Sequence, residues 1–183
     1  MIRTVLALSL LAASGTYTHA QNVEPPVDVN IAGATATIID LAGANQGRAV
    51  IRPTPNGRIF ITISATGLAR GWHAVHVHER GECDPATGFQ SAGEHLGGGA
   101  HGYLAEGGPH AGDLPNQMVQ EDGTLVAEII TDRMGWSRDG DAALFDADGS
   151  AIIIHAQRDD YQTQPGGSAG DRLMCGVFEI PPQ

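Results

Sequence analysis

The sequence predicts an all-β protein, an eight-stranded antiparallel Greek-key barrel or sandwich that carries two long functional loops. Three observations predict this class. Short runs rich in β-branched residues recur along the chain, and glycine, proline, asparagine or aspartate separates them. No run has the 3.6-residue periodicity of an amphipathic helix. Short strands with such turns between them are typical of antiparallel sandwiches and barrels.

The predicted strands follow in chain order. Eight runs have the length and composition of strands: Ala34–Leu41, Arg48–Arg52, Arg58–Thr66, Trp72–Glu79, Leu125–Ile130, Ala142–Phe145, Ala151–His155 and Met174–Glu179. Asn56-Gly57 predicts a tight hairpin between the second and third, because these residues tolerate positive φ. Asp122-Gly123 and Asp148-Gly149 predict two further turns. No internal repeat is found, so we expect one domain over residues 21–183.

Two long segments interrupt the strands. One is the glycine-rich stretch 80–117, and the other is the stretch 156–172, which contains Gly166-Gly167. Irregular segments of this length are uncommon unless they are disordered or functional. The first contains three histidines, which argues against disorder because a bound metal can replace hydrophobic contacts. We therefore expect binding loops mounted on a rigid barrel.

The amino terminus has the pattern of a secretory signal peptide. Arg3 precedes an apolar stretch over residues 4–13, and Thr18-His19-Ala20 is a small-x-small cleavage site. The apolar stretch is too short to span a bilayer, so we expect cleavage after Ala20 and export to the periplasm or the exterior. A core helix is the alternative interpretation of this segment.

Charge and cysteine content narrow the function further. The formal net charge is −11 and the chain has no lysine, which disfavours binding to nucleic acid or to an anionic membrane. Cys83 and Cys175 are the two cysteines of a chain that has an export signal. In an oxidising compartment we expect them to form one disulfide, and two free thiols are the alternative.

Histidines are concentrated in the middle of the chain, with seven of the eight between residues 71 and 155. His76 and His78 lie two residues apart in a predicted strand, so they share one face. By the same parity His73 lies on the opposite face with Val75 and Val77, and we expect it to be a hydrogen-bonded interior residue. A pair of imidazoles on one rigid strand is half of a copper or zinc site.

The remaining candidate ligands lie on the loops and at one strand end. His95, His101 and His110 fall in the first long segment, and Asp113 follows three residues after the last of them. His155 ends the apolar run 151–154 and, by parity, shares the outer face with Ile153 rather than the core face. Any one of these histidines alone is more often a satisfied polar residue than a ligand. Six of them together with an aspartate predict a metal site.

Four motifs carry a resemblance to a known family over nearly the whole chain after the signal segment. They are His73–Glu79, Ser91–His95, His110–Leu114 and Gly170–Val177. With these motifs the chain resembles the copper/zinc superoxide dismutase family. The loop motif, made of Ser91–His95 and His110–Leu114, is very specific together with the final motif.

The resemblance implies a role for each candidate residue. It implies copper bound by His76, His78, His95 and His155, and zinc bound by His95, His101, His110 and Asp113, so that His95 bridges both metals. It further implies that Asp159 links a copper histidine to a zinc histidine, that Cys83 and Cys175 form the family's disulfide, and that His73 is structural. Arg172 matches the family's active-site arginine, which attracts the anionic substrate, and Arg158 is expected to add to this field.

The implied reaction is dismutation of superoxide to oxygen and hydrogen peroxide by a redox-cycling copper beside a structural zinc. The implied catalytic residues are His95, which carries a proton, and Arg172. The competing interpretations are an exported copper-binding or copper-delivery protein, a copper-only dismutase and an inert structural sandwich. The assembly state is left open, with a homodimer as one option.

Three departures from the family pattern affect the channel and the zinc loop. The family's channel lysine is absent, and the segment from His95 to His101 is shorter than usual. Gly166-Gly167 occupies the region where many members have a channel-lining threonine. Steering is therefore expected to be weaker or to come from arginine alone.

Overall fold

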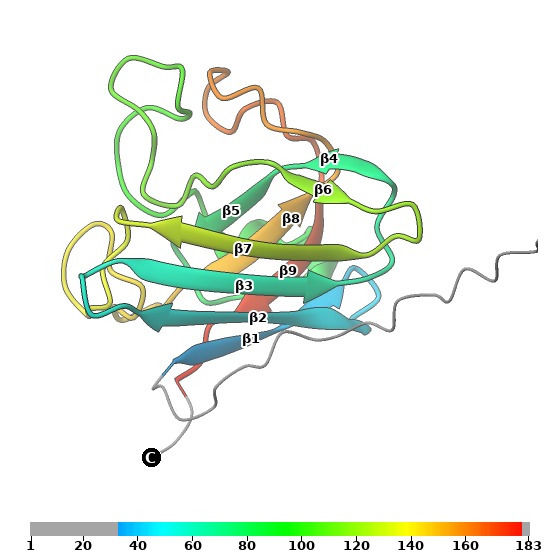
Figure 1. Cartoon of the computed structure of the whole chain (residues 1–183), viewed down its shortest axis with the longest axis horizontal. Coiled ribbons are helices and arrows are strands. Elements are labelled where there is room, and N and C mark those ends of the chain that lie inside the picture. Colours follow the sequence, from blue (N-terminus) through cyan, green and yellow to red (C-terminus); the bar gives the residue numbers. More distant parts are fainter. Residues whose placement is uncertain (1–32, 181–183) are drawn as a thin grey trace, which may run out of the picture. The chain divides into compact units, whose positions relative to one another are not determined.

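The computed structural model describes residues 33–180 of the chain, so the predicted signal peptide lies outside the described residues. Nine strands and two short 3-10 helices form within this range (Figure 1): β1 (Ala34–Asp40), β2 (Asn45–Pro53), β3 (Ile59–Ala65), β4 (Gly71–His73), β5 (Val75–His78), η1 (Pro85–Thr87), η2 (Gln90–Ala92), β6 (Gln117–Val119), β7 (Leu125–Thr131), β8 (Ala151–His155) and β9 (Arg172–Val177). Among the described residues, no helix has the length and apolar character needed to cross a membrane.

All neighbouring strands of the main sheet pair antiparallel, in the order β5-β8-β9-β1-β2-β3-β7. The last strand, β9, thus pairs with the first, β1. Strands β4 and β6 form a separate two-stranded ribbon. This ribbon connects the two edges of the curled sheet, because β4 leads into β5 and β6 lies against β7 (Figure 1). The predicted antiparallel barrel or sandwich is confirmed.

The hairpin between β2 and β3 forms at the predicted turn. Gly57 has φ +77°, and the amide of Thr54 donates to the carbonyl oxygen of Arg58 at 2.8 Å. Glycine suits this position because an L side chain rarely adopts positive φ. The turn sets the register of the two strands, in which Ile51 faces Ile61.

The core sits between the layers of the curled sheet and follows the two-residue alternation of the strands. In β7 every second residue from Leu125 is buried, as expected for a sheet with one face in the core. Ile152 and Ile154 of β8 belong to the main core, whereas Ile153 packs on the other face with Phe89 and Cys175. The predicted parity of this strand is confirmed, and the loop after β5 covers its outer face.

Two strand predictions are wrong and one strand was missed. The predicted strand over residues 72–79 divides at Ala74 into β4 and β5, which belong to different sheets. Residues 142–145 form no strand beyond an isolated bridge between Gly135 and Ala143. Their apolar side chains instead anchor a loop, in which Phe145 packs edge-on against Trp136. The missed strand, β6, lies where the first long loop was expected to end.

The two predicted loops rise beside each other from one end of the sheet. Figure 1 shows the loop after β5 in green and the loop after β8 in orange. Backbone and side-chain hydrogen bonds join them: the amide of Leu104 donates to the carbonyl of Tyr161 at 2.9 Å, and the amide of His101 donates to Gln164 Oε1 at 2.8 Å. The loops are therefore ordered against one another.

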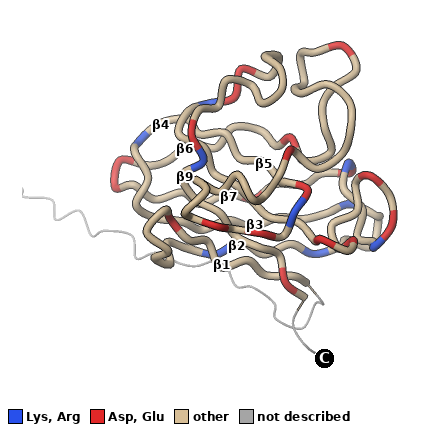
Figure 2. The backbone as a smooth tube through the Cα atoms, turned by 180° about the vertical axis from the view of Figure 1, so that it is seen from behind, with Lys and Arg blue, Asp and Glu red and all other residues tan. Residues whose placement is uncertain are grey.

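Acidic residues outnumber basic residues over the described part of the chain. Figure 2 shows acidic positions on the long loops and on the turns at the sheet ends, with fewer basic positions scattered among them. This distribution agrees with the net charge of −11. An anion that approaches the molecule therefore needs a local positive focus.

Candidate metal centre

Strand β5 carries the predicted histidine pair at the edge of the main sheet, and loop backbone covers that edge. The amide of Val77 donates to the carbonyl of Gly112 at 2.9 Å, and its carbonyl accepts from the amide of Leu96 at 2.8 Å. Residue 112 has to be glycine, because a Cβ there would overlap the carbonyl oxygen of Val77. These contacts make His76 and Asp113 bridge partners, and likewise His78 and His95.

Four imidazoles converge at the first group of donor atoms. One ring nitrogen from each lies within 4.8 Å of the others, and all four residues are buried: His76, His78, His95 and His155. His76 Nδ1 and His155 Nε2 are 3.2 Å apart, a separation suited to two ligands of one metal ion. These are the four residues predicted to bind copper.

A second group forms around one carboxylate oxygen. Asp113 Oδ1 lies 2.7 Å from His95 Nδ1, 3.1 Å from His101 Nδ1 and 3.4 Å from His110 Nδ1. The other oxygen, Oδ2, accepts the backbone amides of Gly102 and His110 at 2.8 and 3.0 Å. Backbone thus orients the carboxylate while three imidazole nitrogens face its free oxygen. These four residues are the set predicted to bind zinc, and they share His95 with the first group.

Hydrogen bonds outside the two groups determine which nitrogen of each ring faces inward. Five of the six imidazoles place one nitrogen against an acceptor outside the donor groups: His76 Nε2 and His101 Nε2 on Asp159, His78 Nδ1 on Gly93 O, His110 Nε2 on Gly99 O and His155 Nδ1 on Gly170 O. In the neutral form of each ring the bound nitrogen donates, which leaves the other nitrogen with a lone pair. Among residues 33–180, only His95 of these six lacks such an anchor. Neither of its nitrogens is bound outside the two groups, so each group can have one of them as a donor atom.

Two unpartnered atoms test whether metal ions fit these groups. Within the described range, His78 Nε2 and His110 Nδ1 are buried side-chain nitrogens without a hydrogen-bond partner. A buried unpaired acceptor is costly, and one such nitrogen lies in each group. A metal ion about 2.0–2.1 Å from imidazole nitrogens would satisfy both. Four imidazoles suit copper, and three imidazoles with one carboxylate suit tetrahedral zinc, so the residues fit both ions.

Burial keeps the first group ready to bind a cation. It lowers the pKa of His76 to about 4, although the hydrogen bond to Asp159 acts in the opposite direction. Burial, together with the charges of neighbouring histidines and Arg172, also holds the pKa values of His78 and His155 well below the usual range. Neutral imidazole is the form that binds metal, so no proton has to be displaced from these rings near pH 7.

In the second group, the pKa shifts favour the charged forms of His101 and Asp113. Burial alone would lower the pKa of His101, but hydrogen bonds to Asp113 and Asp159 outweigh it and raise this pKa to about 9. Burial likewise opposes ionisation of Asp113, yet hydrogen bonds from His101, His95 and the Gly102 amide hold its pKa well below the usual range. Without a metal, His101 and Asp113 form an ion pair at the position that a cation would take.

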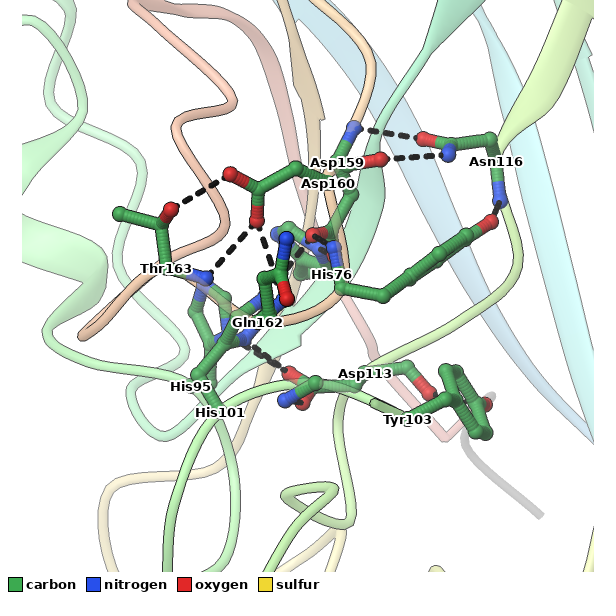
Figure 3. Close-up of polar contacts among 12 residues, drawn as sticks. His76, His95, His101, Tyr103, Asp113, Asn116, Asp159, Asp160, Gln162 and Thr163 are labelled. Atoms are coloured by element: carbon green, nitrogen blue, oxygen red, sulfur yellow. Dashed lines mark hydrogen bonds and ion pairs between the residues drawn. The ribbon is translucent and has the colours of Figure 1, made fainter. Parts of the chain in front are cut away.

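Asp159 contacts one imidazole of each group on the side away from the donor atoms (Figure 3). Its Oδ2 lies 2.9 Å from His76 Nε2, and its Oδ1 lies 2.9 Å from His101 Nε2. The carboxylate is fully buried. Gly167 lies against it with φ +66°, and a Cβ there would overlap Asp159 Oδ1. This position therefore requires glycine for both its backbone conformation and its close approach.

Arg172 lies beside the first group through strand pairing, since it faces His155 across β8 and β9. Its Nη1 and Nη2 donate to the carbonyls of Phe89 and Gly93, each at 2.8 Å. No ion pair joins it to Asp171 or to another acid in the described part of the chain. The guanidinium charge is thus held next to the four imidazoles without being neutralised.

A groove of about 940 Å³ lies beside two of the donor residues, His95 and His110. His95, His110 and Pro165 line this groove, and so do six acidic residues: Glu79, Glu94, Asp139, Asp141, Asp146 and Asp148. Both histidines are largely covered, with side chains that are 5% and 13% exposed.

Comparison with known proteins decides the family. The family model for copper/zinc superoxide dismutase matches residues 45–178. This chain belongs to the copper/zinc superoxide dismutase family. The "Superoxide dismutase [Cu-Zn]" of Caulobacter vibrioides is 40% identical over 80% of this chain and 85% of its own length. The "Superoxide dismutase [Cu-Zn] 2" of Aquifex aeolicus is 36% identical over 95% of this chain and 96% of its own length.

Solved structures of the same family have the same fold. A double mutant of a superoxide dismutase-like protein from Bacillus subtilis aligns with a TM-score of 0.75 and 34% identity, over 80% of this chain and 97% of that chain. The Cu/Zn superoxide dismutase from Brucella abortus aligns with a TM-score of 0.63 and 25% identity, over 80% and 99%.

The disulfide predicted for this superoxide dismutase-family chain is present. Cys83 and Cys175 are joined, with their Cα atoms 5.7 Å apart and a sequence separation of 92. The bond connects the loop after β5 to β9, three residues beyond Arg172. It therefore secures the loop whose carbonyls hold the guanidinium.

His73 has a structural position, as predicted. It is buried, and its two ring nitrogens lie 2.6 Å from the carbonyl oxygen of His155 and 2.8 Å from that of Ala69. It belongs to neither donor group. Its contacts connect the segment before β4 to the end of β8.

Sequence reasoning missed several residues that hold the site together. Asn116 contacts the backbone of Asp159, Tyr161 contacts its carboxylate, and the two residues contact each other. Gly112 and Gly167 permit close approaches. None of them has a local pattern that distinguishes it from an ordinary loop residue. The Gly166-Gly167 pair is the only signal that could have pointed to one of them.

Proposed function

We propose that this chain catalyses the dismutation of superoxide to oxygen and hydrogen peroxide, with copper at the four-imidazole group and zinc at the group around Asp113. The observation that carries the proposal is the position of His95. It is the one imidazole shared by both groups, and among the described residues it is the only one of the six without a hydrogen-bond acceptor outside them. Family membership supports the same reaction.

For the copper site we propose His76, His78, His95 and His155 as ligands. A copper ion bound there supplies the one-electron chemistry of both half-reactions. The chain's contribution is to orient the lone pairs: the carbonyls of Gly93 and Gly170 hold His78 and His155, and Asp159 holds His76. Such outer hydrogen bonds fix the tautomer and the ring orientation of ligating histidines.

For the zinc site we propose His95, His101, His110 and Asp113. Four protein ligands leave no open position, so the role of the ion is structural. It would neutralise the carboxylate of Asp113 and replace the proton that His101 otherwise holds. Its charge would also favour loss of the second ring proton of His95.

His95 is the proposed proton carrier. The nitrogen of His95 that faces the first group would hold a proton and give it to the product peroxide. His95 also lines the groove, so this ring is in contact with solvent-accessible space. General acid chemistry of this kind needs a donor within hydrogen-bond reach of the reacting oxygen.

Arg172 is the proposed anion-binding residue. Its guanidinium is half-buried, forms no ion pair with an acid of the described residues and is adjacent to the first group, whereas the net charge of the chain is −11. A fixed positive charge in a cleft raises the local concentration of an anionic substrate. Arg158, which is exposed, is a weaker candidate for the same field.

The alternative, an exported copper-binding or copper-delivery protein, is not favoured. Such a protein would need neither the complete zinc group nor a guanidinium held beside the copper group. A superoxide-consumption assay, paired with elemental analysis of the purified protein, tests the choice directly. We expect one copper and one zinc per chain and rapid catalytic loss of superoxide. Full copper binding without catalysis would support delivery instead.

We further propose that residues 1–20 are removed and that residues 21–183 act as one exported domain. The disulfide supports an oxidising compartment, the periplasm or the exterior. Mass spectrometry of the mature protein from each cell fraction tests cleavage after Ala20 and the compartment together. A homodimer is one possible assembly, and sedimentation of the metal-loaded protein distinguishes it from a monomer.

A further inference from the structure

We propose that Tyr161 and Asn116 are positioning residues that hold the carboxylate of Asp159 between the copper and zinc sites. The inference rests on the proposed function, because it assigns the two residues a role in metal binding. It starts from Asp159, whose own position the proposed metal ligands do not explain. A single buried carboxylate orients one imidazole of each group, so the geometry of both groups depends on what holds Asp159 itself.

Asn116 pairs with the backbone of Asp159 in both directions (Figure 3). The amide of Asp159 donates to Asn116 Oδ1 at 2.7 Å, and Asn116 Nδ2 donates to the carbonyl of Asp159 at 2.9 Å. Two antiparallel hydrogen bonds from one planar side chain restrict rotation about that backbone segment. Because Asn116 follows three residues after Asp113, this pairing also connects Asp159 to the zinc group.

Tyr161 contacts this pair from two sides. Its hydroxyl oxygen accepts the backbone amide of Asn116 at 2.7 Å, and its own amide donates to Asp159 Oδ1 at 2.6 Å. The same Oδ1 accepts from His101 Nε2 at 2.9 Å. Tyr161 therefore orients the carboxylate oxygen that faces the zinc group, while it holds the backbone of the residue that clamps Asp159.

The backbone of Tyr161 is strained, and residues 102–104 of the loop after β5 hold it in place. Its φ is +64°, a conformation that few residues other than glycine adopt. Its carbonyl accepts the amide of Leu104 at 2.9 Å, and its ring packs edge-on against Tyr103 with centroids 5.6 Å apart. Gly102 permits this approach, since a Cβ there would overlap the Tyr161 carbonyl. Strain maintained by several contacts is typical of functional positions.

The contacts of Asn116 and Tyr161 with Asp159, here called the clamp, affect both donor groups. If the clamp loosens, Asp159 can rotate, and rotation weakens its hydrogen bonds to His76 and His101 together. A group that only stabilised the fold would lower the unfolding temperature without changing the ligand field of copper. Tyr161 and Asn116 should instead change both metal sites in the folded protein.

The test uses full-length metal-loaded protein and two near-isosteric variants. Tyr161→Phe removes only the hydroxyl that accepts the Asn116 amide. Asn116→Asp keeps the acceptor for the Asp159 amide but removes the donor to its carbonyl. The matched control is Thr163→Val in the same loop, which removes a hydroxyl that bonds only to Asp160 and leaves the clamp intact. The readouts are the electron paramagnetic resonance spectrum of Cu(II) and the rate of zinc transfer to a chelator.

We expect Tyr161→Phe and Asn116→Asp to shift the Cu(II) spectrum and to release zinc about ten-fold faster, the lower end of the loss typical for groups that orient ligating histidines. Thr163→Val should match the wild type in both readouts. Wild-type spectra and wild-type zinc release in both clamp variants would overturn the inference. Failure of the wild-type protein itself to bind copper and zinc would overturn the proposed function, and this inference with it.

Discussion

His78 and Arg172 donate hydrogen bonds to the same acceptor, the carbonyl oxygen of Gly93, at 3.0 and 2.8 Å. One backbone atom therefore orients both a proposed copper ligand and the proposed anion-binding group. The distance between the guanidinium and the copper group is set by this shared contact and by the pairing of Arg172 with His155. A shift of the Gly93 carbonyl would therefore move both the proposed anion-binding group and a proposed copper ligand.

Removing the charge of Arg172 should slow the reaction without removing the metals. We expect Arg172→Gln to lower kcat/KM for superoxide by roughly ten-fold or more, the lower range of electrostatic steering effects. Arg172→Lys keeps the charge but loses one of the two carbonyl contacts, so its loss should be smaller. Fast-kinetic decay of superoxide at several salt concentrations measures both variants. Unchanged activity in a fully metal-loaded Arg172→Gln protein would rule out the steering role.

The close contact at Gly167 predicts a loss of zinc binding on a minimal substitution. Gly167→Ala places a Cβ against Asp159 in a left-handed backbone conformation, so the carboxylate has to move away from His101. We expect zinc affinity to fall by about 10–100-fold. Gly166→Ala is the matched control, because its Cβ would lie at 3.7 Å from His95 Nε2 without overlap. Competition with a zinc chelator measures both, and equal affinities would contradict the prediction.

The metal-free protein should be most stable near pH 6.5. The pKa of His76 is lowered to about 4, and those of His78 and His155 are also lowered. As pH falls from about 6.5 towards 4, the unfolded chain gains protons that these rings do not, so stability is lost, by about 1.4 kcal/mol per pH unit for each ring.

Above pH 6.5 the sign reverses because of His101. Its pKa is raised to about 9, so its contribution is complete below 6.5 and is lost as pH rises to about 9. Denaturant unfolding of the chelator-treated protein from pH 4.5 to 9 measures the resulting maximum. A stability that increases steadily up to pH 9 would show that His101 is not held by Asp113 and Asp159.

The disulfide should contribute strongly to stability because it closes a long loop. In the chain-entropy account, a loop of 92 residues is worth about 4–5 kcal/mol. We expect the Cys83→Ser, Cys175→Ser double variant to lose most of this free energy of unfolding in the metal-free state. Denaturant titration measures it. Equal unfolding free energies for the variant and the oxidised wild type would contradict the loop-closure argument.

Most of the fold follows from local pattern, and the exceptions have physical causes. The two-residue alternation of β7 and the Asn56-Gly57 turn predicted strands and a hairpin that the structure contains. The run 142–145 has the composition of a strand, but its apolar residues pack a loop onto the core, and short apolar runs do not distinguish the two outcomes. Strand β6 is too short and too polar to be recognised without its partner β4.

The candidate site was predictable in its donors but not in its supports. All seven residues expected to bind metal lie in the two donor groups, because strand parity and loop histidines are visible in the sequence. The contacts of Arg172 with Phe89 and Gly93, and those of Asn116 with Asp159, are long-range and involve backbone atoms. Backbone acceptors leave no residue-type signal, so only the folded arrangement reveals them.

The most direct measurement is anomalous X-ray diffraction from crystals of metal-loaded protein, recorded at the copper and zinc absorption edges. The account predicts two peaks, one on each side of the His95 ring, with copper near His76, His78 and His155 and zinc near His101, His110 and Asp113. A single peak, or two peaks that do not flank His95, would contradict it.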